Sequence, residues 1–294
     1  MKIAISGATG FIGRHVVAEM KKRSLQPTLL VRPGRSVAEP NQTVIECDLK
    51  NPPEDLYQQL GRPDVLIHLA WGGLPQYASL HHFEEELPAH YQFLKQLIRG
   101  GLKRCLITGT CLEYGKQEGE LVEERPACPI VPYAFAKDSL RRQLEFLRMT
   151  QEFHLTWARL FYTYGEGQAA ASLYSQLRAA VARGDKVFDM SGGEQVRDYL
   201  PVDAVARALT ELASIQTEVG IVNVCAGHGV TVRRLVEEWV QQNQWQITLN
   251  FGRLPYLDYE AMNFWGSDRK LKTVLNGRSL CEISASNDKL QQGN

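Results

Sequence analysis

A tyrosine and a lysine four residues apart are the first candidates for chemistry in this sequence. Tyr133 and Lys137 lie in a helical stretch that begins at Pro132, a residue suited to the first turn of a helix. Residues i and i+4 share one helix face, so the phenol and the ammonium lie together. A tyrosine hydroxyl titrates near ~10, and a neighbouring cation lowers that pKa toward the range of acid–base catalysis. Ordinary exposed helices contain the same spacing, so the pair alone does not establish a site.

Hydroxyl groups also follow an apolar run upstream of this tyrosine. Residues 104–109 read as a strand, and Thr110 comes directly after it. In doubly wound folds, ligands bind at the carboxyl ends of parallel strands. We therefore expect Thr110 to lie beside Tyr133, where its hydroxyl can polarise a substrate carbonyl.

A glycine-rich loop, residues 7–13, separates the first apolar run from the first helical stretch. Glycines allow a tight turn and a close approach to a pyrophosphate, and the helix N-terminus adds free N–H groups and a positive dipole end. The strand–loop–helix context predicts a dinucleotide ligand; a glycine-rich turn without a ligand is the alternative. The residues expected to contact the cofactor here are Gly7, Thr9, Gly10, Phe11, Ile12 and Gly13.

Charged residues after the second and third apolar runs bear on which dinucleotide binds. An acid after the second strand binds the ribose hydroxyls of NAD, whereas an arginine accommodates the 2′-phosphate of NADP. The sequence has Arg32 and Arg35 there and no acid, so we expect NADP(H) rather than NAD(H), with Arg14 nearby. Two solvated surface arginines are the alternative. Asp48, after the third run, either accepts from the adenine amino group or belongs to a solvated turn.

Short apolar runs alternate with helical stretches along the chain. This alternation predicts βαβ units and a parallel sheet covered on both faces. We expect an α/β fold in which residues 1–165, with a returning segment near 197–225, form a doubly wound Rossmann-like domain, and 166–294 form a smaller substrate-binding α/β domain. The expected strands are 2–6, 28–31, 43–46, 65–69, 104–109, 155–161 and 220–225, and the expected helices are 14–23, 84–98, 132–150, 169–183, 203–213 and 232–242.

Composition excludes several classes of protein. Lys+Arg and Asp+Glu both number 33 among the 294 residues, and this balance argues against a nucleic-acid-binding protein. No apolar run approaches the ~20 residues that span a bilayer, and no export signal begins the sequence. The six cysteines show no CxxC pair and no zinc spacing, so we expect reduced thiols, no metal site and a cytoplasmic protein without a membrane partner.

Taken together, the motifs resemble those of the extended short-chain dehydrogenase/reductase family, in its nucleotide-sugar epimerase/dehydratase/reductase group. By this resemblance Tyr133 would be the catalytic acid/base, Lys137 would bind the nicotinamide ribose and tune Tyr133, and Thr110 would hold the reacting carbonyl. The resemblance extends to about residue 276 and is carried by residues 7–13, 48–49, 68–70, 108–115, 133–137, 159–165, 197–203 and 223–227.

The resemblance also implies binding residues and a partner. His68 would be a packed strand residue, and Arg197 would meet the substrate diphosphate, a structural salt bridge being the alternative. A homodimer would form through a four-helix bundle of helices 84–98 and 132–150. The other implied cofactor contacts are Asp48, Leu49, Leu69 and Ala70, the other substrate contact is Trp71, and further aromatics that could cover the sugar or base are Tyr256, Tyr259 and Trp265.

Departures from the family pattern narrow the expected reaction. Dehydratases of this group carry an Asp-Glu pair where this chain has Cys111-Leu112, which cannot transfer protons, and Tyr162 stands where the group usually has Asn. We therefore expect NADPH-dependent reduction of the 4-keto group of a nucleoside-diphosphate 4-keto-6-deoxyhexose, with dTDP favoured as the nucleotide. The alternative is an NAD-dependent nucleotide-sugar 4-epimerase. A non-catalytic binding protein of the same fold is disfavoured because Tyr133 and Lys137 are both present.

Overall fold

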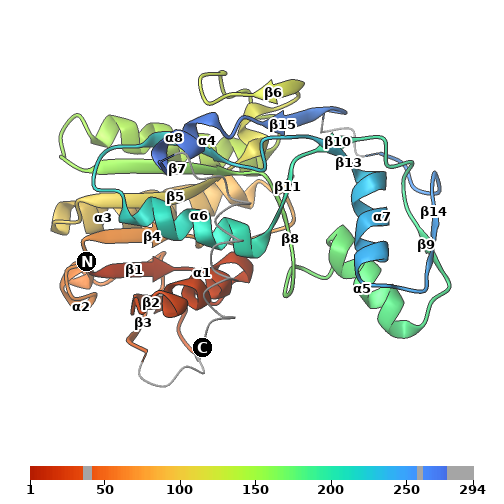
Figure 1. Ribbon diagram of the computed structural model, residues 1–294. Coiled ribbons are helices and arrows are strands. Elements are labelled where there is room, and N and C mark those ends of the chain that lie inside the picture. The colour runs from red at the N-terminus through yellow and green to blue at the C-terminus, as the bar shows by residue number, and fades with distance from the viewer. Residues whose placement is uncertain (36–41, 257–260, 277–294) are drawn as a thin grey trace.

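A seven-stranded parallel sheet forms the centre of the molecule in the computed structural model, which describes residues 1–35, 42–256 and 261–276 (Figure 1). Every neighbouring pair in this sheet is parallel, which confirms the doubly wound α/β fold expected from the alternation of strands and helices. The strands, in spatial order, are β12 (Gly220–Val224), β7 (His154–Leu160), β5 (Arg104–Thr110), β4 (Val65–His68), β1 (Ile3–Ser6), β2 (Thr28–Val31) and β3 (Val44–Glu46).

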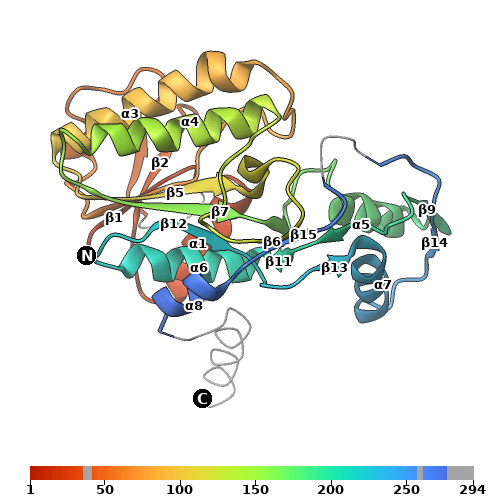
Figure 2. The ribbon, with the colours of Figure 1, turned by 90° about the horizontal axis from the view of Figure 1, so that it is seen from above.

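Helices cover both faces of this sheet (Figure 2). The strands β1 and β4 are buried along their whole length, as expected for a sheet that packs against helices on each side. Two apolar cores result, one on each face. The first face carries α1 (Phe11–Lys22), α6 (Val202–Ser214) and α8 (Arg269–Val274), and the second carries α2 (Leu56–Gln59), α3 (Leu87–Gly100) and α4 (Pro132–Leu147).

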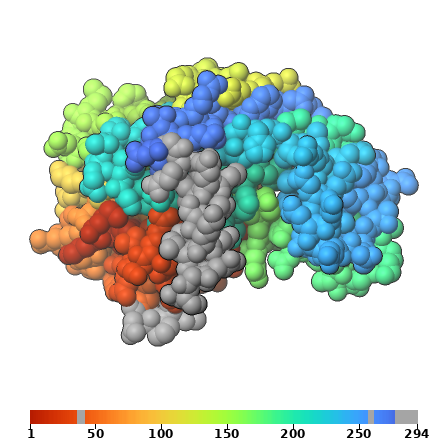
Figure 3. All heavy atoms as spheres, viewed as in Figure 1, coloured from red at the N-terminus to blue at the C-terminus, as the bar shows by residue number. Residues whose placement is uncertain are grey.

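A smaller lobe projects from the carboxyl end of the sheet and is visible on the right of Figure 3. It has its own apolar core, in which Trp239 is almost fully buried. Its elements are α5 (Leu173–Arg183), β9 (Val187–Asp189), α7 (Val232–Gln242) and β14 (Thr248–Asn250). Short two-stranded sheets connect the two bodies: β8 (Tyr162–Tyr164) with β11 (Tyr199–Pro201), β10 (Val196–Arg197) with β13 (Val230–Thr231), and β6 (Gly119–Leu121) with β15 (Phe264–Gly266).

The later part of the chain is divided between the two bodies. The helix α6 and the strand β12 return to the large sheet, and α8 packs on the same side, with Leu271 and Leu275 in the core of the first face. The division into domains at residue 165 therefore stays a prediction. Tyr259 and Cys281 lie outside the described residues.

The bounds of several helices differ from the sequence expectation; for example, α4 ends at Leu147 rather than residue 150, and α5 begins at Leu173 rather than residue 169. The first helix begins at Phe11 rather than residue 14, because residues 11–13 of the glycine loop already turn as a helix. A π-helical turn, η1 (His82–Glu86), precedes α3 and continues into it. Of the helices described, none combines the length and the apolar character needed to cross a bilayer.

Candidate active site

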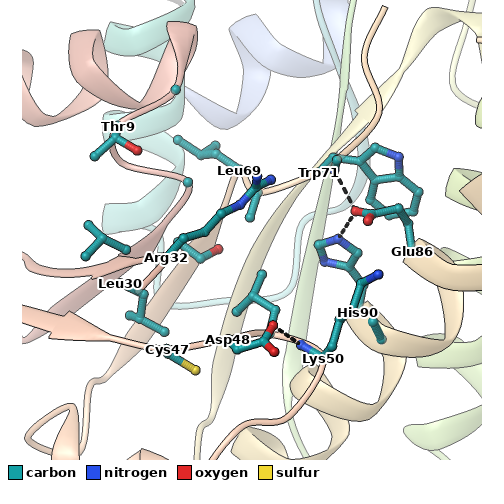
Figure 4. Close-up of a pocket in the computed structure, with 18 of the residues that line it drawn as sticks. Thr9, Leu30, Arg32, Cys47, Asp48, Lys50, Leu69, Trp71, Glu86 and His90 are labelled. Atoms are coloured by element: carbon teal, nitrogen blue, oxygen red, sulfur yellow. Dashed lines mark hydrogen bonds and ion pairs between the residues drawn. The ribbon is translucent and has the colours of Figure 1, made fainter. Parts of the chain in front are cut away.

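A groove of about 770 Å³ lies at the carboxyl ends of β1, β2, β3 and β4 (Figure 4). Most residues expected to bind the cofactor line it. Figure 4 shows Arg32 reaching across the groove toward Leu69, with Asp48 and Lys50 nearby. The predicted residues that line the groove are Gly7, Thr9, Gly10, Arg32, Arg35, Asp48, Leu49, Leu69, Ala70 and Trp71.

The glycine loop is shaped by close backbone approaches, and it leaves a helix end open. Gly7 has φ +76°, and a Cβ there would lie 2.6 Å from the backbone nitrogen of Ala70. A Cβ at Gly13 would lie 2.1 Å from the carbonyl oxygen of Gly7. The helix α1 has Gly10 as its N-cap and no side-chain cap, so its first N–H groups are available to an anion. The loop therefore fits the pyrophosphate of a dinucleotide.

Positive side chains surround the part of the groove beyond β2. Arg14, Arg32, Arg35 and Lys50 all line it. Within the described residues, the Arg32 guanidinium has no ion-pair partner that would compete with a ligand. Asp48 accepts from the backbone nitrogen of Lys50 at 3.0 Å, so it lies in a turn and in the groove at the same time.

A second cavity of about 510 Å³ lies between the large sheet and the smaller lobe. It is lined by Thr110, Tyr133 and Lys137, so the fold brings the three expected catalytic residues together from β5 and α4. Leu69 and Trp71 line both this cavity and the groove, which places the three residues at their junction. Phe11 and Ile12 line the second cavity, and their expected contact with the cofactor stays a prediction.

Thr110 is held in place by a buried carboxylate. The side chain of Glu113 in the 3₁₀ turn η2 (Cys111–Tyr114) accepts from the Thr110 backbone nitrogen at 2.9 Å. The same carboxylate accepts from Arg159 Nε at 2.7 Å and from Trp157 Nε1 at 3.0 Å, and both charged side chains are buried. The Thr110 hydroxyl oxygen accepts from the Leu112 backbone nitrogen at 3.3 Å, which leaves its proton for donation to the Tyr133 oxygen or to a ligand.

The electrostatics of Tyr133 differ from the sequence expectation. Burial raises the pKa of Tyr133, and hydrogen bonding to Thr110 acts in the opposite direction. Lys137 was expected to lower this pKa, but its Nζ donates to the carbonyl oxygen of Thr108 at 2.9 Å. Burial also lowers the pKa of Lys137 to about 7. In the free protein, desolvation therefore makes the largest contribution to both pKa values.

A hydrogen-bonded histidine chain beneath the groove is absent from the sequence expectations. Ser6 Oγ lies 2.6 Å from His68 Nδ1, and His68 Nε2 lies 2.7 Å from His90 Nδ1. His90 Nε2 lies 3.1 Å from Glu86 Oε2, which also accepts from the Gly72 backbone nitrogen at 2.6 Å (Figure 4). These side chains come from β1, β4, η1 and α3, so no local spacing signals the chain.

Arg197 lies at the far side of the second cavity, almost fully buried. Its Nη1 donates to the carbonyl oxygens of Val196 and Met262 at 2.9 Å, and its guanidinium carbon lies 4.6 Å from the centre of the Phe264 ring. The adjacent Asp198 accepts from the backbone nitrogens of Ala226 and Gly227, and burial raises its pKa to about 6. Asp198 therefore links the segment that carries Arg197 to the loop at Ala226 and Gly227.

Some of the remaining sequence candidates line the second cavity, and others lie outside it. Cys111, Leu112 and Tyr162 line the second cavity, whereas Tyr256 is exposed and hydrogen-bonds to Glu194. Trp265 packs beside Gly229. Among the described side chains, no group of three or more His, Cys, Asp or Glu is placed to hold a metal ion.

Comparisons with known proteins give matches over most of the chain. The model of the NAD dependent epimerase/dehydratase family matches residues 3–225. The chain is similar to the dTDP-6-deoxy-L-talose 4-dehydrogenase (NAD(+)) of Aggregatibacter actinomycetemcomitans, with 28% identity over 91% of this chain and 100% of that protein. It is also similar to the dTDP-6-deoxy-L-talose 4-dehydrogenase (NAD(P)(+)) of Kitasatospora kifunensis, with 26% identity over 82% of this chain and 79% of that protein.

One solved structure supports the fold. MoeE5 in complex with UDP-glucuronic acid and NAD superposes with a TM-score of 0.80 and 24% identity, covering 97% of this chain and 100% of that one. At this identity the likeness concerns the fold alone.

Proposed function

The chain belongs to the NAD dependent epimerase/dehydratase family, and we propose that it is a reductase of nucleotide sugars within that family. The proposed reaction is NADPH-dependent reduction of the 4-keto group of a nucleoside-diphosphate 4-keto-6-deoxyhexose, with dTDP as the favoured nucleotide. The observation that carries the proposal is the grouping of Thr110, Tyr133 and Lys137 at the junction of the groove and the second cavity.

The chain's own residues would polarise and protonate the ketone. A bound reduced nicotinamide supplies the hydride that adds to C4. The Tyr133 hydroxyl donates its proton to the ketone oxygen as the alcohol forms, and the Thr110 hydroxyl, whose oxygen is already satisfied by Leu112, donates a second hydrogen bond. Lys137, one helical turn away, stabilises the phenolate left behind.

Neighbouring side chains argue against dehydration. Cys111 and Leu112 line the cavity directly after Thr110, where the dehydratases that this chain resembles have an Asp-Glu pair. The aliphatic side chain of Leu112 cannot exchange a proton, so one member of the acid–base pair that loss of water from the hexose requires is missing. The related dehydrogenases named above act on a 6-deoxyhexose at C4, the carbon of the proposed reaction.

The choice of NADP(H) is supported by charge. Arg32 and Arg35 line the groove at the end of β2, and a guanidinium binds phosphate in a bidentate manner. The name of the Aggregatibacter relative specifies NAD(+), and that of the Kitasatospora relative specifies NAD(P)(+). Competition between NADPH and NADH for the free protein tests the choice of cofactor.

The far end of the second cavity supports a nucleotide rather than a free sugar. Two carboxamide oxygens, Gln168 Oε1 and Gln195 Oε1, are buried there without a hydrogen-bond partner among the described residues. The side-chain nitrogen of Gln168 donates to the carbonyl oxygen of Thr163 at 2.7 Å, and this bond fixes the orientation of the carboxamide. An unpaired buried acceptor is costly, and the imide N–H of thymine or uracil supplies the missing donor.

A balance of cofactor and sugar distinguishes the reductase from the epimerase. The protein is incubated with NADPH and a panel of dTDP-, GDP-, CDP- and UDP-4-keto-6-deoxyhexoses, and NADP and 6-deoxysugar nucleotide are quantified in the same vessel. A reductase forms the two in a ratio near one. Interconversion of UDP-glucose and UDP-galactose without added cofactor would instead identify a 4-epimerase.

The matched control for this experiment is Tyr133→Phe. The change removes one oxygen and leaves the ring packing on Tyr77 and Trp71, so cofactor affinity survives. General acid catalysis supplies roughly 10²–10⁴-fold, and we expect turnover to fall by that factor. Turnover close to that of the wild type in the Phe variant would refute the role assigned to Tyr133.

A further inference from the structure

Lys137 is a buried ammonium whose charge has few compensating groups. Its side chain is 2% exposed, and its Nζ donates to one neutral acceptor, the carbonyl oxygen of Thr108. Among the described residues, no carboxylate lies within ion-pair distance of this nitrogen; Glu113 and Glu86 act on it only from farther away. A buried charge without a counter-ion tends to neutralise. A neighbouring group must therefore stabilise the ammonium if Lys137 is to keep its proton.

The indole of Trp71 lies where it can stabilise the ammonium of Lys137. Lys137 Nζ lies 4.0 Å from the centre of the Trp71 ring, well inside the ~6 Å range of a cation–π interaction. Tryptophan offers the strongest such face among the aromatic side chains, and removal from water strengthens the interaction. Trp71 itself lies in the loop after β4, where it separates the groove from the second cavity.

Two histidines fix the position of Trp71. Its Nε1 donates to His82 Nδ1 at 3.1 Å, and His82 Nε2 lies 3.0 Å from the carbonyl oxygen of Gln76. The imidazole of His90 stacks on the indole at 4.6 Å with an interplanar angle of 11°. Figure 4 shows Trp71, Glu86 and His90 close together at one end of the groove. Because Glu86 and His68 in turn anchor His90, the indole is held on an edge and on a face.

We propose that Trp71 is a positioning residue for Lys137, keeping the buried ammonium charged at the site of the proposed reaction through its indole face. The inference rests on the proposed function only for the role of Lys137 beside Tyr133. Lys137 must be charged to stabilise a phenolate, so Trp71 sets the upper pH limit of that function.

Other charged groups around Lys137 are already committed to partners. Glu113 pairs with Arg159, and Glu86 accepts from His90 and Gly72. Burial lowers the pKa of the surrounding histidines, and the charge of Lys137 lowers it further, so they are neutral neighbours. The titratable groups facing Lys137 or Tyr133 from the packed elements are Tyr133 on α4, Glu113 and Cys111 on η2, His68 on β4, His82 and Glu86 on η1, His90 on α3 and Tyr77 in the loop before η1.

Titration of Lys137 by NMR tests the inference without cofactor or substrate. The full chain is labelled with 13Cε-lysine, and the signal of Lys137 is assigned by its disappearance in Lys137→Met. Burial, opposed by the distant carboxylates of Glu113 and Glu86, places the pKa of Lys137 at about 7. Because the indole stabilises the ammonium further, we expect the wild-type midpoint to lie above that value. In Trp71→Leu the midpoint falls by about one pH unit, a tenfold loss of proton affinity that corresponds to about 1.4 kcal/mol. In Trp71→Phe the decrease is smaller, since a weaker ring remains.

The matched control is Trp245→Leu. Trp245 packs in the smaller lobe next to Tyr174, so the same substitution there leaves the Lys137 midpoint unchanged. An unchanged or raised midpoint in folded Trp71→Leu overturns the inference. If Trp71→Leu does not fold, the decision passes to Trp71→Phe, where a wild-type midpoint overturns it. A lowered midpoint in a protein without reductase activity would leave the inference standing and refute only the proposed function.

Discussion

At the end of β2, Arg32 and Arg35 bring two guanidinium groups into the cofactor groove beside Asp48 and Lys50. Their residue types alone suggested phosphate recognition, and their location in the groove is what that function requires. At Tyr133 and Lys137 the residue types are equally suggestive, but burial sets their proton affinities. The chemistry of a side chain at this site therefore depends on its identity and on its desolvation.

Replacement of the two arginines tests the choice of cofactor. In Arg32→Ala/Arg35→Ala, NADPH should bind roughly tenfold to hundredfold more weakly, because a charge-assisted contact of ~1.5–3 kcal/mol to the 2′-phosphate is lost. NADH, which lacks that phosphate, should be almost unaffected. Calorimetric titration with both cofactors measures the difference. The control Arg183→Ala/Arg234→Ala removes two exposed guanidiniums from the smaller lobe; equal losses for NADPH and NADH in the groove variant would contradict the assignment.

The buried histidine His68 makes stability depend on pH. Burial lowers the pKa of His68 well below 6.5 in the folded state. Below pH 6.5 the unfolded chain therefore binds a proton at His68 that the folded chain does not bind. Stability is therefore present above about pH 6.5 and is lost as the pH falls. Each proton that only the unfolded chain binds changes the free energy of unfolding by about 1.4 kcal/mol per pH unit.

We expect His68→Gln to reduce the pH dependence of the free energy of unfolding by up to about 1.4 kcal/mol per pH unit, the contribution of one proton. Urea unfolding between about pH 5 and pH 7, roughly the window in which histidine titrates, measures the free energy of unfolding at each pH. The control is His154→Gln, at an exposed position. If His68→Gln kept the full wild-type slope, His68 would not be the residue responsible.

Among the elements, the turn after β5 shows how the fold positions the hydroxyl of Thr110. Thr110 ends the strand and caps η2, and Glu113 returns to the Thr110 backbone nitrogen. The Glu113 carboxylate also neutralises Arg159 from the neighbouring strand β7. One buried side chain therefore couples the register of two central strands to the position of the Thr110 hydroxyl.

Removal of that carboxylate charge should be strongly destabilising. Glu113→Gln keeps the size of the side chain but leaves Arg159 buried without a counter-charge, a loss of about 3–5 kcal/mol. Urea unfolding at neutral pH measures it. In the control, Glu120→Gln breaks an ion pair with Arg269, whose side chain is 74% exposed, and should have far less effect. Equal stabilities for the two variants would show that the buried pair contributes nothing.

At the scale of the whole molecule, α3 and α4 lie side by side on one outer face (Figure 2). Large apolar side chains at and after α4 remain exposed: Phe135 is 50% exposed, Phe146 70% and Met149 80%. Clustered exposed apolar residues mark a surface for association. This arrangement supports the proposed homodimer, in which both copies contribute α3 and α4 to a four-helix bundle.

Light scattering after size-exclusion chromatography tests the dimer. We expect the wild type to elute at twice the chain mass of 33.1 kDa. Phe146→Asp should shift it to the mass of one chain, because a charge would have to be buried in the interface. Val187→Asp is the control, since Val187 is a similarly exposed apolar residue on the smaller lobe. A monomeric wild type would end the proposal.

Most of the helices and strands, and the residue types of the site, follow from patterns along the chain. Apolar runs alternating with helical stretches specified the parallel sheet, because strands buried on both faces have no polar side to show. Local spacing likewise specified the loop at residues 7–13 and the Tyr133–Lys137 pair, since each depends on one turn or one helix face.

The surroundings of those residues depend on contacts between distant parts of the chain. Ser6, His68, His90 and Glu86 come from four elements, and the stack of Lys137 on Trp71 joins α4 to the loop after β4. No spacing along the chain records such contacts. The proton affinities follow from them, because desolvation depends on what is packed above a side chain rather than on what precedes it in the sequence.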